Sequence, residues 1–475
     1  MFKMKKMKKM VKFFMTVAAI AAITSCSNEE IISGEGTVAS SERATLSVTI
    51  SGGSQATRAL GDSNANTEEL KVSNATIFVF NDQNVYQADT TVVLSNHAVA
   101  GTDNAYKVEF HVPTGANKRV YVALNFSDAM KNAVKSSGLT AMTYAIVGQE
   151  NLFYVSNNTT PNYTTYVGNP MFNESIVTTN VVQGATNSAN VTVERLTAKI
   201  TVVKETGSPL ATGNITTSNA IFSNSNIRFA MGNKNTKILP MKEQTSWIDP
   251  NWDGNLGLYG SDFQHEFEVY GKQYDQWNMT QFIVVDDQTT AEKNRKTKYA
   301  FENTHKFAQM GEVTYAAIAV EFTPEQIATS FDLGGTNAPT TITYTSGTKA
   351  EDSVFVVIDN NAYYYYVDSL EAKKHTTYLS SLPGVTAGVS YTTYCNLTCF
   401  YRVWLNSGVA SSSKEYQAKR NEYYSIGLSD IDRLGDPYPE IDDPTVIIGA
   451  TSAITVNITV KEWSLVNMGG VILGN

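Results

Sequence analysis

The sequence predicts an all-β protein with more than one domain, and three observations lead to this prediction. The chain has 475 residues, which exceeds the usual size of a single domain. Hydrophobic residues make up 42% of it and charged residues only 17%, while Thr, Asn, Ser, Val and Tyr are abundant. Many short segments alternate apolar and polar residues, which is the period of a half-buried strand. This combination is typical of extracellular β-proteins.

The alternating segments predict strands along most of the chain, at residues 75–80, 105–112, 118–125, 191–204, 314–322, 353–358, 361–367, 397–405 and 422–428. A short helix is expected at 128–136, because Ser127 suits an N-cap and Gly138 a stop. Within 191–204 the apolar residues change parity, so we expect a β-bulge near Glu194 and Arg195. We place a domain boundary at the start of this segment.

The N-terminus has the pattern of an export signal. Six lysines precede an apolar run at residues 13–25, which is shorter than the about 20 residues that a membrane-spanning helix needs. We therefore expect a signal peptide at residues 1–25. Small residues then precede Cys26, as in the lipobox of bacterial lipoproteins, where the cysteine is acylated. The alternative is an ordinary signal peptide followed by an incidental cysteine.

A regular strand pattern follows soon after this signal. Leu46, Val48 and Ile50 alternate with threonine and serine, so one face of the predicted strand at 44–50 is apolar. Arg43 and Arg58 stand on either side of the strand as candidate protease sites. A strand this close to the export signal, with an arginine after it, needs an explanation.

A second regular pattern lies near the C-terminus. Residues 454–460 alternate apolar and polar without a break, and Trp463 and Leu465 continue with shifted parity. Val471, Ile472 and Leu473 follow after two glycines, at a position where a chain end normally frays. An acidic, proline-rich linker at 435–444 precedes the whole segment.

Nothing in the sequence points to catalysis. It contains no Gly-rich phosphate loop and no G-x-S-x-G or H-E-x-x-H motif, and its five histidines are scattered. The stretch at 249–260 imitates the start of a calcium loop, but Pro250 takes the second position and Gly260 the twelfth, so we interpret it as a turn. We expect no enzyme activity, no cofactor and no metal.

The charge, the cysteine spacing and the aromatic residues bear on nucleic-acid binding, disulfide formation and sugar binding, respectively. The net charge is −9 and no basic tract follows the signal, which argues against nucleic acid. Cys395 and Cys399 would lie about 13 Å apart in an extended strand, so we expect two free cysteines unless a kink or bulge brings them together. Tyrosines in the run 361–369 could stack on sugars, although in a strand two of the four face the core.

Six stretches occur in one order over most of the chain: KRVYVALNFSDAMKNAV, NVTVERLTAKITV, ENTHK with TYAAIAVEFTP, FYRVWLN, KRNEYYSIGLSDIDRLGDP and ITVNITVKEWSL. In this order they resemble the Bacteroidales fimbrilins, the subunits of type V pili. Within that superfamily they are most similar to the Mfa1-like subunits of the minor fimbrium shaft.

The resemblance implies two transthyretin-like Greek-key β-sandwich domains, which we place at residues 59–190 and 191–475. It also implies a lipidated propeptide at 26–58, attached to the outer membrane through Cys26 and removed by an arginine-specific protease. The matching cleavage point falls between Arg58 and Ala59. Arg43 is a second candidate, but cleavage there would leave the strand at 44–50 attached.

The resemblance further implies polymerisation by strand exchange. The strand with Leu46, Val48 and Ile50 is then a placeholder, and Val471, Ile472 and Leu473 are the expected donor strand, with 454–465 as the alternative. The expected partners are identical subunits, anchor and tip fimbrilins, and surface receptors on host or bacterial cells, in an extracellular adhesive fimbrium. The competing hypothesis is a surface lipoprotein of related fold that stays anchored and binds glycan or a host protein.

Overall fold

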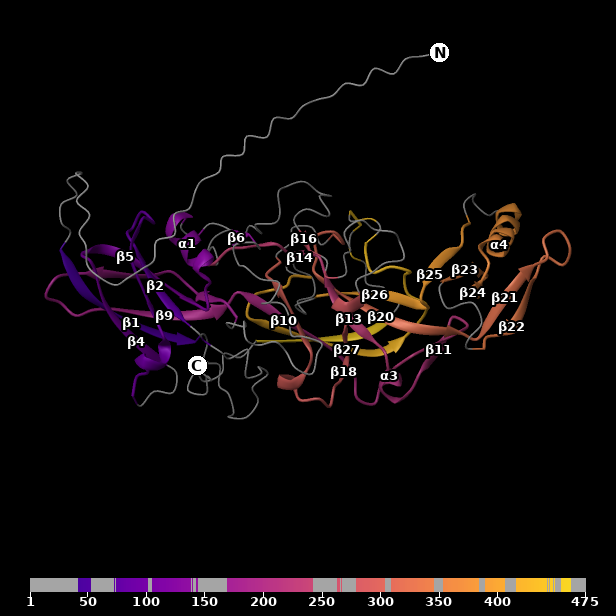
Figure 1. Ribbon diagram of the computed structural model, residues 1–475, viewed down its shortest axis with the longest axis horizontal. Helices are drawn as coiled ribbons and strands as arrows, with labels where there is room; N and C mark the ends of the chain where they lie inside the picture. Colours follow the sequence, from indigo (N-terminus) through magenta and orange to yellow (C-terminus); the bar gives the residue numbers. More distant parts are fainter. Residues whose placement is uncertain are drawn as a thin grey trace, which may run out of the picture. The chain divides into compact units, whose positions relative to one another are not determined.

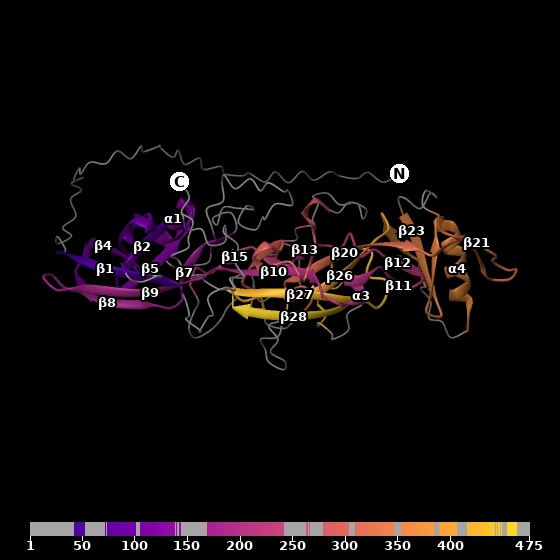
Figure 2. The same ribbon diagram turned by 90° about the horizontal axis from the view of Figure 1, so that it is seen from below.

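The computed structural model describes residues 42–52, 72, 74–100, 105–137, 139, 142–143, 169–241, 263–264, 266, 279–303, 309–345, 353–383, 389–405, 416–441, 443, 445–446, 448 and 454–462. Strands dominate this part of the chain and the helices are short (Figures 1 and 2). The predicted all-β fold class is confirmed. Helix α1 (Asp128–Ser137) lies where the sequence predicts it, and Ser127 Oγ accepts a hydrogen bond of 3.3 Å from the Met130 N–H.

The first sheet, here called the β1 sheet, has eight strands in the order β3-β2-β5-β7-β9-β1-β4, with β8 also paired to β5. Its strands are β1 (Arg43–Gly52), β2 (Ala75–Phe80), β3 (Tyr86–Val92), β4 (Ala105–Pro113), β5 (Gly115–Leu124), β7 (Met171–Asn173), β8 (Val177–Val181) and β9 (Asn187–Arg195). Apolar side chains from all eight of these strands and from the 3-10 helix η1 (Leu94–His97) meet in one buried cluster. The sheet therefore encloses a core of its own.

The opposite face of β2 and β5 is buried as well. Phe78 on β2 and Tyr121 on β5 pack with Met130 and Val134 of α1, and the same cluster includes Tyr423 from the second half of the chain. Both faces of β2 are thus covered, which explains why its six residues read as a continuous run rather than as an alternation. This second cluster joins the β1 sheet to the part of the chain that follows it.

The predicted bulge near Glu194 and Arg195 is wrong. The chain leaves the β1 sheet at the end of β9 (Asn187–Arg195), and Leu196 alone separates β9 from β10 (Thr197–Lys204), which belongs to another sheet. Leu196 is fully buried. The change of parity in the sequence therefore marks the passage from one sheet to the next. The domain boundary that the sequence places at residues 190 and 191 stays a prediction.

Two further sheets face each other across the largest apolar cluster. One contains β10, β18 (Asp286–Asp287), β19 (Thr297–Phe301), β27 (Glu422–Ile431) and β28 (Ile454–Glu462). The other contains β11 (Ile215–Thr217), β12 (Ala220–Phe222), β13 (Arg228–Gly232), β17 (Ile283–Val284), β20 (Tyr315–Pro324) and β26 (Thr398–Trp404). Side chains from both sheets, such as Ile200, Ile426, Phe229 and Ile318, fill the space between them. This pair is a β-sandwich.

The remaining elements are small. Two two-stranded pairs, β14 with β16 and β15 with β6, lie outside the larger sheets. The strands of these pairs are β6 (Met142–Thr143), β14 (Lys234–Asn235), β15 (Lys237–Ile238) and β16 (Phe263–Gln264). Three short helices also occur in this part of the chain: α3 (Pro209–Thr212), η4 (Met279–Gln281) and η5 (Glu292–Asn294).

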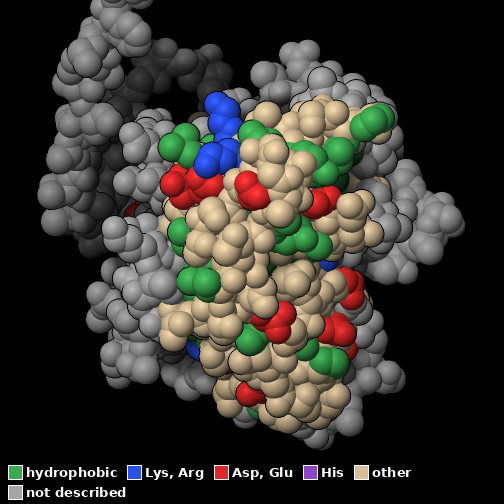
Figure 3. Space-filling model, turned by 90° about the vertical axis from the view of Figure 1, so that its right-hand side faces the viewer, with side chains coloured by type: hydrophobic (Ala, Val, Ile, Leu, Met, Phe, Trp, Pro, Cys, Tyr) green, Lys and Arg blue, Asp and Glu red, His purple; other side chains and the backbone are tan. Residues whose placement is uncertain are grey.

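A fourth sheet is inserted between two paired strands. β20 and β26 are antiparallel neighbours, yet between them the chain forms β21 (Gln326–Phe331), β22 (Pro339–Thr343), β23 (Ser353–Asp359), β24 (Ala362–Tyr366), α4 (Ser369–Ser381) and β25 (Thr392–Cys395). The sheet order is β22-β21-β24-β23-β25, and α4 packs on β21, β23 and β24. We call these residues, 326–395, the inserted unit. Figure 3 views the end of the molecule that carries it, where hydrophobic side chains lie in separate spots.

The sequence did not predict α4, and its buried face explains why. The residues that α4 buries are Ala372, His375, Thr376 and Leu379. They have helical spacing, but two of them are polar, so no apolar period is visible. The tyrosine run lies in β24, and its side chains alternate as in a strand: Tyr363 and Tyr365 pack with the sandwich cluster, whereas Tyr364 and Tyr366 pack with the residues that α4 covers.

The proline-rich segment at 435–444 is more than a linker. Asp436 and Phe400 exchange two backbone hydrogen bonds of 2.8 Å, and Tyr315 Oη donates to the Pro439 carbonyl at 3.0 Å. Arg402 forms an ion pair of 2.6 Å with Asp436. The described part of this segment is therefore bound to β20 and β26 by backbone hydrogen bonds, a side-chain hydrogen bond and an ion pair.

Candidate functional site

Strand β1 is an inner strand of its sheet, and the candidate site depends on this position. It pairs in parallel with β9 over seven residue pairs and antiparallel with β4 over nine. Among the described residues, β4 pairs with no strand other than β1. Removing β1 would therefore open a groove with two unpaired edges, one on β9 and one on β4 (Figures 1 and 2).

The inward side of β1 is fully buried. Leu46, Val48 and Ile50 each have 0% exposure, and all three belong to the core cluster of the β1 sheet. They pack there with residues of every neighbouring strand, including Val108 on β4 and Val191 on β9. The three residues that the sequence singled out as a placeholder thus form one continuous apolar row.

The outward side of β1 faces a row of charged and polar residues on β4. Thr45 lies opposite His111, and their side chains approach to 3.4 Å; Ser47 lies opposite Glu109. Glu109 forms an ion pair of 2.7 Å with Lys107. This ion pair and, more weakly, a hydrogen bond from Ser47 hold the pKa of Glu109 below its ordinary value. The groove therefore has a polar lip beside its apolar floor.

The start of β1 is held by contacts from outside the strand ladder. Asn187 on β9 donates from its side-chain amide to the Thr45 carbonyl at 3.0 Å. Arg43 lies within β1, paired with Pro113, and its guanidinium donates to the His111 carbonyl at 3.4 Å. The sequence did not single out Asn187, because an asparagine at the start of a strand, beside other polar residues, carries no signal of a long-range contact.

The other sequence-predicted site residues lie outside the described residues. These are Cys26, Arg58, Ala59, Val471, Ile472 and Leu473. The stretch that imitates a calcium loop, 249–260, lies outside them too. Of the sequence-predicted site residues, the structure describes Leu46, Val48 and Ile50 and the second cleavage candidate Arg43, and all four lie on β1.

The two cysteines near the C-terminus are free, as the sequence predicts. Cys399 is fully buried beside Tyr401, and burial raises the pKa of its thiol to about 12. Cys395 is half-buried next to Ser353. A thiol that stays protonated at neutral pH is a poor nucleophile, so Cys399 does not resemble a catalytic cysteine.

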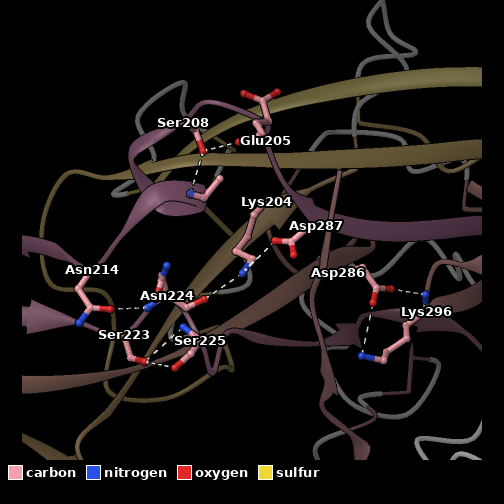
Figure 4. Close-up of polar contacts among 11 residues, drawn as sticks. Lys204, Glu205, Ser208, Asn214, Ser223, Asn224, Ser225, Asp286, Asp287 and Lys296 are labelled. Atoms are coloured by element: carbon pink, nitrogen blue, oxygen red, sulfur yellow. Dashed lines mark hydrogen bonds and ion pairs between the residues drawn. The ribbon is translucent and has the colours of Figure 1, made fainter. Parts of the chain in front are cut away.

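Polar residues gather where β10 and β18 end, and Figure 4 shows them. Lys204 forms an ion pair of 3.0 Å with Asp287, and Lys296 one of 3.5 Å with Asp286. Ser208 caps α3 by accepting from the Ala211 N–H at 3.2 Å. The opposite charges in each ion pair neutralise each other, and the contacts hold the loops in place. Among the described residues, no group of three or more His, Cys, Asp or Glu side chains is placed to hold a metal ion.

Two family models match the chain, and both describe fimbrial subunits. Residues 44–219 match the model described as Major fimbrial subunit protein (FimA). Residues 392–468 match the model described as Major fimbrial subunit protein type IV, Fimbrillin, C-terminal. Together the matches span more than half of the 475 residues and contain β1 from its second residue and the whole of β28. The chain is a Bacteroidales fimbrilin.

Solved structures resemble the fimbrilin at low sequence identity. A protein assigned to cell adhesion from Parabacteroides distasonis is 13% identical, with a TM-score of 0.46 over 89% of this chain and 100% of that one. A fimbrilin (FimA) from Porphyromonas gingivalis is 14% identical, with a TM-score of 0.43 over 88% and 97%. The tip fimbrial protein Mfa3 from the same organism is 12% identical, with a TM-score of 0.35 over 88% and 99%. No curated protein sequence matches the fimbrilin.

The family gives the fimbrilin its general role. It is a structural subunit of a cell-surface fimbria and assembles with other fimbrilin subunits. Members of these families are structural proteins rather than enzymes. In the part of the chain that the structure describes, no helix has the length and apolar character needed to cross a membrane.

Proposed function

We propose that this fimbrilin is exported as a lipoprotein acylated at Cys26, is cut between Arg58 and Ala59, and polymerises by exchanging β1 for a strand of a second copy. The observation that carries the proposal is the place of β1. It is an inner strand with a fully buried apolar row, yet it precedes the candidate cleavage site. Cleavage there would leave β1 attached to the body by non-covalent contacts alone.

An empty groove is unfavourable in free energy, and this favours binding of a replacement strand. Burial of Leu46, Val48 and Ile50 contributes about 1.5–3 kcal/mol each, so loss of β1 forfeits about 5–9 kcal/mol of apolar burial. The backbone groups of β4 and β9 that face β1 would also lose their partners. An open groove of this kind binds a replacement strand by β-augmentation.

The position of Arg43 supports Arg58 as the cleavage site that frees β1. Arg43 is part of β1 and is paired with Pro113 on β4, so its peptide bond lies within a strand ladder. Cleavage after Arg43 would also leave residues 44–52 joined to the body of the subunit. Only cleavage after the strand, as at Arg58, frees the whole of β1.

The incoming strand belongs to the C-terminal part of a second copy. Two segments qualify, the last residues with Val471, Ile472 and Leu473, and the segment 454–465. Because donor and groove are different surfaces, each subunit binds one neighbour and offers a strand to the next, which produces an open filament. Anchor and tip fimbrilins and surface receptors would be the further partners of such an adhesive fimbrium.

The N-terminal residue of subunits sheared from the cell surface tests the proposal. We expect filament subunits to begin at Ala59, and we expect Arg58→Ala to leave lipidated, unpolymerised precursor at the outer membrane. Arg43→Ala is the matched control and should assemble normally. Filaments of normal length from Arg58→Ala would contradict the proposal, and a subunit that stays lipidated on its native cells would indicate an anchored surface lipoprotein instead.

A further inference from the structure

Arg433 differs from the other arginines that follow the proposed cleavage site, and the inference drawn from it rests on the proposed function. The chain has seven arginines after Arg58. Four lie in strands (Arg119, Arg195, Arg228 and Arg402), and two are buried outside strands (Arg295 and Arg420). Arg433 is exposed and lies in a loop, two residues after the end of β27. An exposed arginine in a loop is the kind of site that an arginine-specific protease cuts.

Cleavage after Arg433 would damage the subunit. It would separate residues 434–475 from the rest of the fimbrilin. β28 belongs to these residues, and among the described strands it pairs with β27 alone. The subunit would then hold its last described strand by non-covalent contacts only. A fimbrilin that must be cut at Arg58 therefore needs Arg433 to be closed to the same protease.

The peptide bond between Arg433 and Leu434 is held on both sides. The Arg433 carbonyl accepts a hydrogen bond of 2.9 Å from Tyr401 Oη, and the Leu434 N–H donates one of 3.0 Å to Ser218 Oγ. The Leu434 side chain is buried in the core cluster of the sandwich. A protease binds its substrate as an extended chain whose backbone groups are free, so it would have to break both hydrogen bonds and withdraw the leucine from the core.

The residues on either side of this bond are held in the same way. Thr217 Oγ1 donates to the Asp432 carbonyl at 2.9 Å, and Tyr394 Oη donates to the Gly435 carbonyl at 2.7 Å. The backbone at Gly435 lies so close to β26 that a Cβ there would be 2.5 Å from the Phe400 carbonyl oxygen. The loop therefore turns its backbone toward the protein while the arginine side chain points into solvent.

The two groups that hold the bond come from well-fixed elements. Tyr401 is buried on β26, and burial raises its pKa well above the ordinary value, so its hydroxyl keeps the proton that it donates. Ser218 and Asn219 have φ angles of 53° and 55° and form the two-residue turn between β11 and β12. Tyr365 Oη donates to the Ser218 carbonyl at 2.7 Å and holds this turn in place.

We propose that Tyr401 and Ser218 close the bond between Arg433 and Leu434 to the arginine-specific protease that matures the fimbrilin, so that the folded subunit is cut at Arg58 and stays whole at Arg433. Arg433 is then a latent cleavage site. A chain that meets the protease before this loop has closed is cut there as well.

Timed digestion of the folded precursor tests the inference. A purified endopeptidase that cuts only after arginine is added, and mass spectrometry of the fragments gives a separate rate for each arginine. In the natural chain we expect cleavage at Arg433 to be at least about a hundredfold slower than at Arg58. Tyr401→Phe removes one hydrogen bond. Ser218→Gly removes the other and allows the positive φ. Each should make cleavage at Arg433 about threefold to tenfold faster and leave the rate at Arg58 unchanged.

Two controls separate local opening from general loss of stability. Tyr424 is buried like Tyr401, and its hydroxyl also donates to a backbone carbonyl, that of Gln417 at 3.0 Å, so Tyr424→Phe should leave the rate at Arg433 unchanged. Cleavage at Arg119, which lies in the inner strand β5, reports unfolding of the β1 sheet and should stay as slow as in the natural chain.

Three results would overturn the inference: equal rates at Arg433 in the natural chain and both variants, an equal increase in Tyr424→Phe, or a natural chain cut as fast at Arg433 as at Arg58. A natural chain that is not cut at Arg58 would contradict the proposed function instead. The comparison between the variants at Arg433 would still decide the inference in that case.

Discussion

Asn187 on β9 donates a hydrogen bond of 3.0 Å from its side chain to the backbone carbonyl of Thr45 on β1, across 142 residues of sequence. The same amide nitrogen donates to the carbonyls of Val182 and Ala185, and the amide oxygen accepts from the Val182 N–H at 2.8 Å. One side chain therefore closes the turn between β8 and β9 and fastens the first residues of β1. Any strand that takes the place of β1 meets the same donor.

We expect Asn187→Ala to lower the free energy of unfolding of the precursor by about 0.5–1.5 kcal/mol, because it removes the side-chain hydrogen bonds that join β1 to the turn between β8 and β9. The fragment that carries β1 should also leave faster after cleavage at Arg58. Thermal unfolding and the release rate measure the two effects. Asn190→Ala is the control, since Asn190 is exposed on the same strand and should change stability by less than about 0.5 kcal/mol. An Asn187→Ala variant as stable as the control would show that the Asn187 side chain does not hold β1 in place.

Val48→Ala should lower the stability of the precursor but not that of the filament. Val48 is fully buried, so the variant precursor should lose about 1.5–3 kcal/mol in its free energy of unfolding. The assembled filament should be as stable as before, because its groove no longer contains β1. Chemical denaturation of precursor and filament makes the comparison, with Thr49→Ala as the control. If the filament loses stability by the same amount, β1 remains in place after assembly.

Cys26→Ala tests the lipid attachment. The variant precursor should not incorporate labelled palmitate and should not fractionate with the outer membrane. Labelling of the Cys26→Ala chain at the level of the natural chain would show that acylation, if any, occurs elsewhere. Cys395→Ala is the matched control, since that cysteine lies within the folded inserted unit.

Acid should weaken the inserted unit through His375. This residue is buried in α4, stacks on Phe331 at 4.4 Å, and contacts Tyr366 Oη at 3.0 Å and Asp359 at 3.4 Å. Burial lowers the pKa of its imidazole, and Asp359 opposes this only in part. The unfolded chain therefore binds the proton more readily, so stability falls as pH drops below the ordinary histidine pKa of about 6.5.

Thermal unfolding at pH 7.5 and pH 5 measures this effect. We expect the His375→Gln variant to lose less stability between the two pH values than the natural chain does, even if it is less stable at both. His97→Gln is the control, because His97 is not buried. An identical pH dependence in the His375 variant and the natural chain would exclude the histidine as its cause.

Removal of residues 471–475 distinguishes the two candidate donors. If residues 454–460 fill the groove, the shortened chain should still be processed and should form SDS-resistant polymers. Loss of all polymers, with the subunit still folded and cut at Arg58, would instead assign the donor role to Val471, Ile472 and Leu473. A subunit that no longer folds would show that the last residues contribute to their own core.

Much of the fold could be read from local pattern, and its failures have physical causes. β2, β20 and β27 appear close to their predicted ranges because each has a run of β-forming residues bounded by turns. α4 could not be predicted, because its buried face uses His375 and Thr376. The parity change near Arg195 was visible in the sequence, but only the structure distinguishes a bulge from a change of sheet at Leu196.

The sequence by itself determined that Leu46, Val48 and Ile50 form one apolar face of a strand beside a protease-type arginine, because the alternation of side chains in a strand is a local property. It could not determine that this strand lies between β4 and β9. Strand neighbours are chosen by packing between segments far apart in the chain, here residues 43–52 with 105–113 and 187–195. Only the tertiary structure decided that β1 has a neighbouring strand on each side and that β28, among the described residues, pairs with β27 alone.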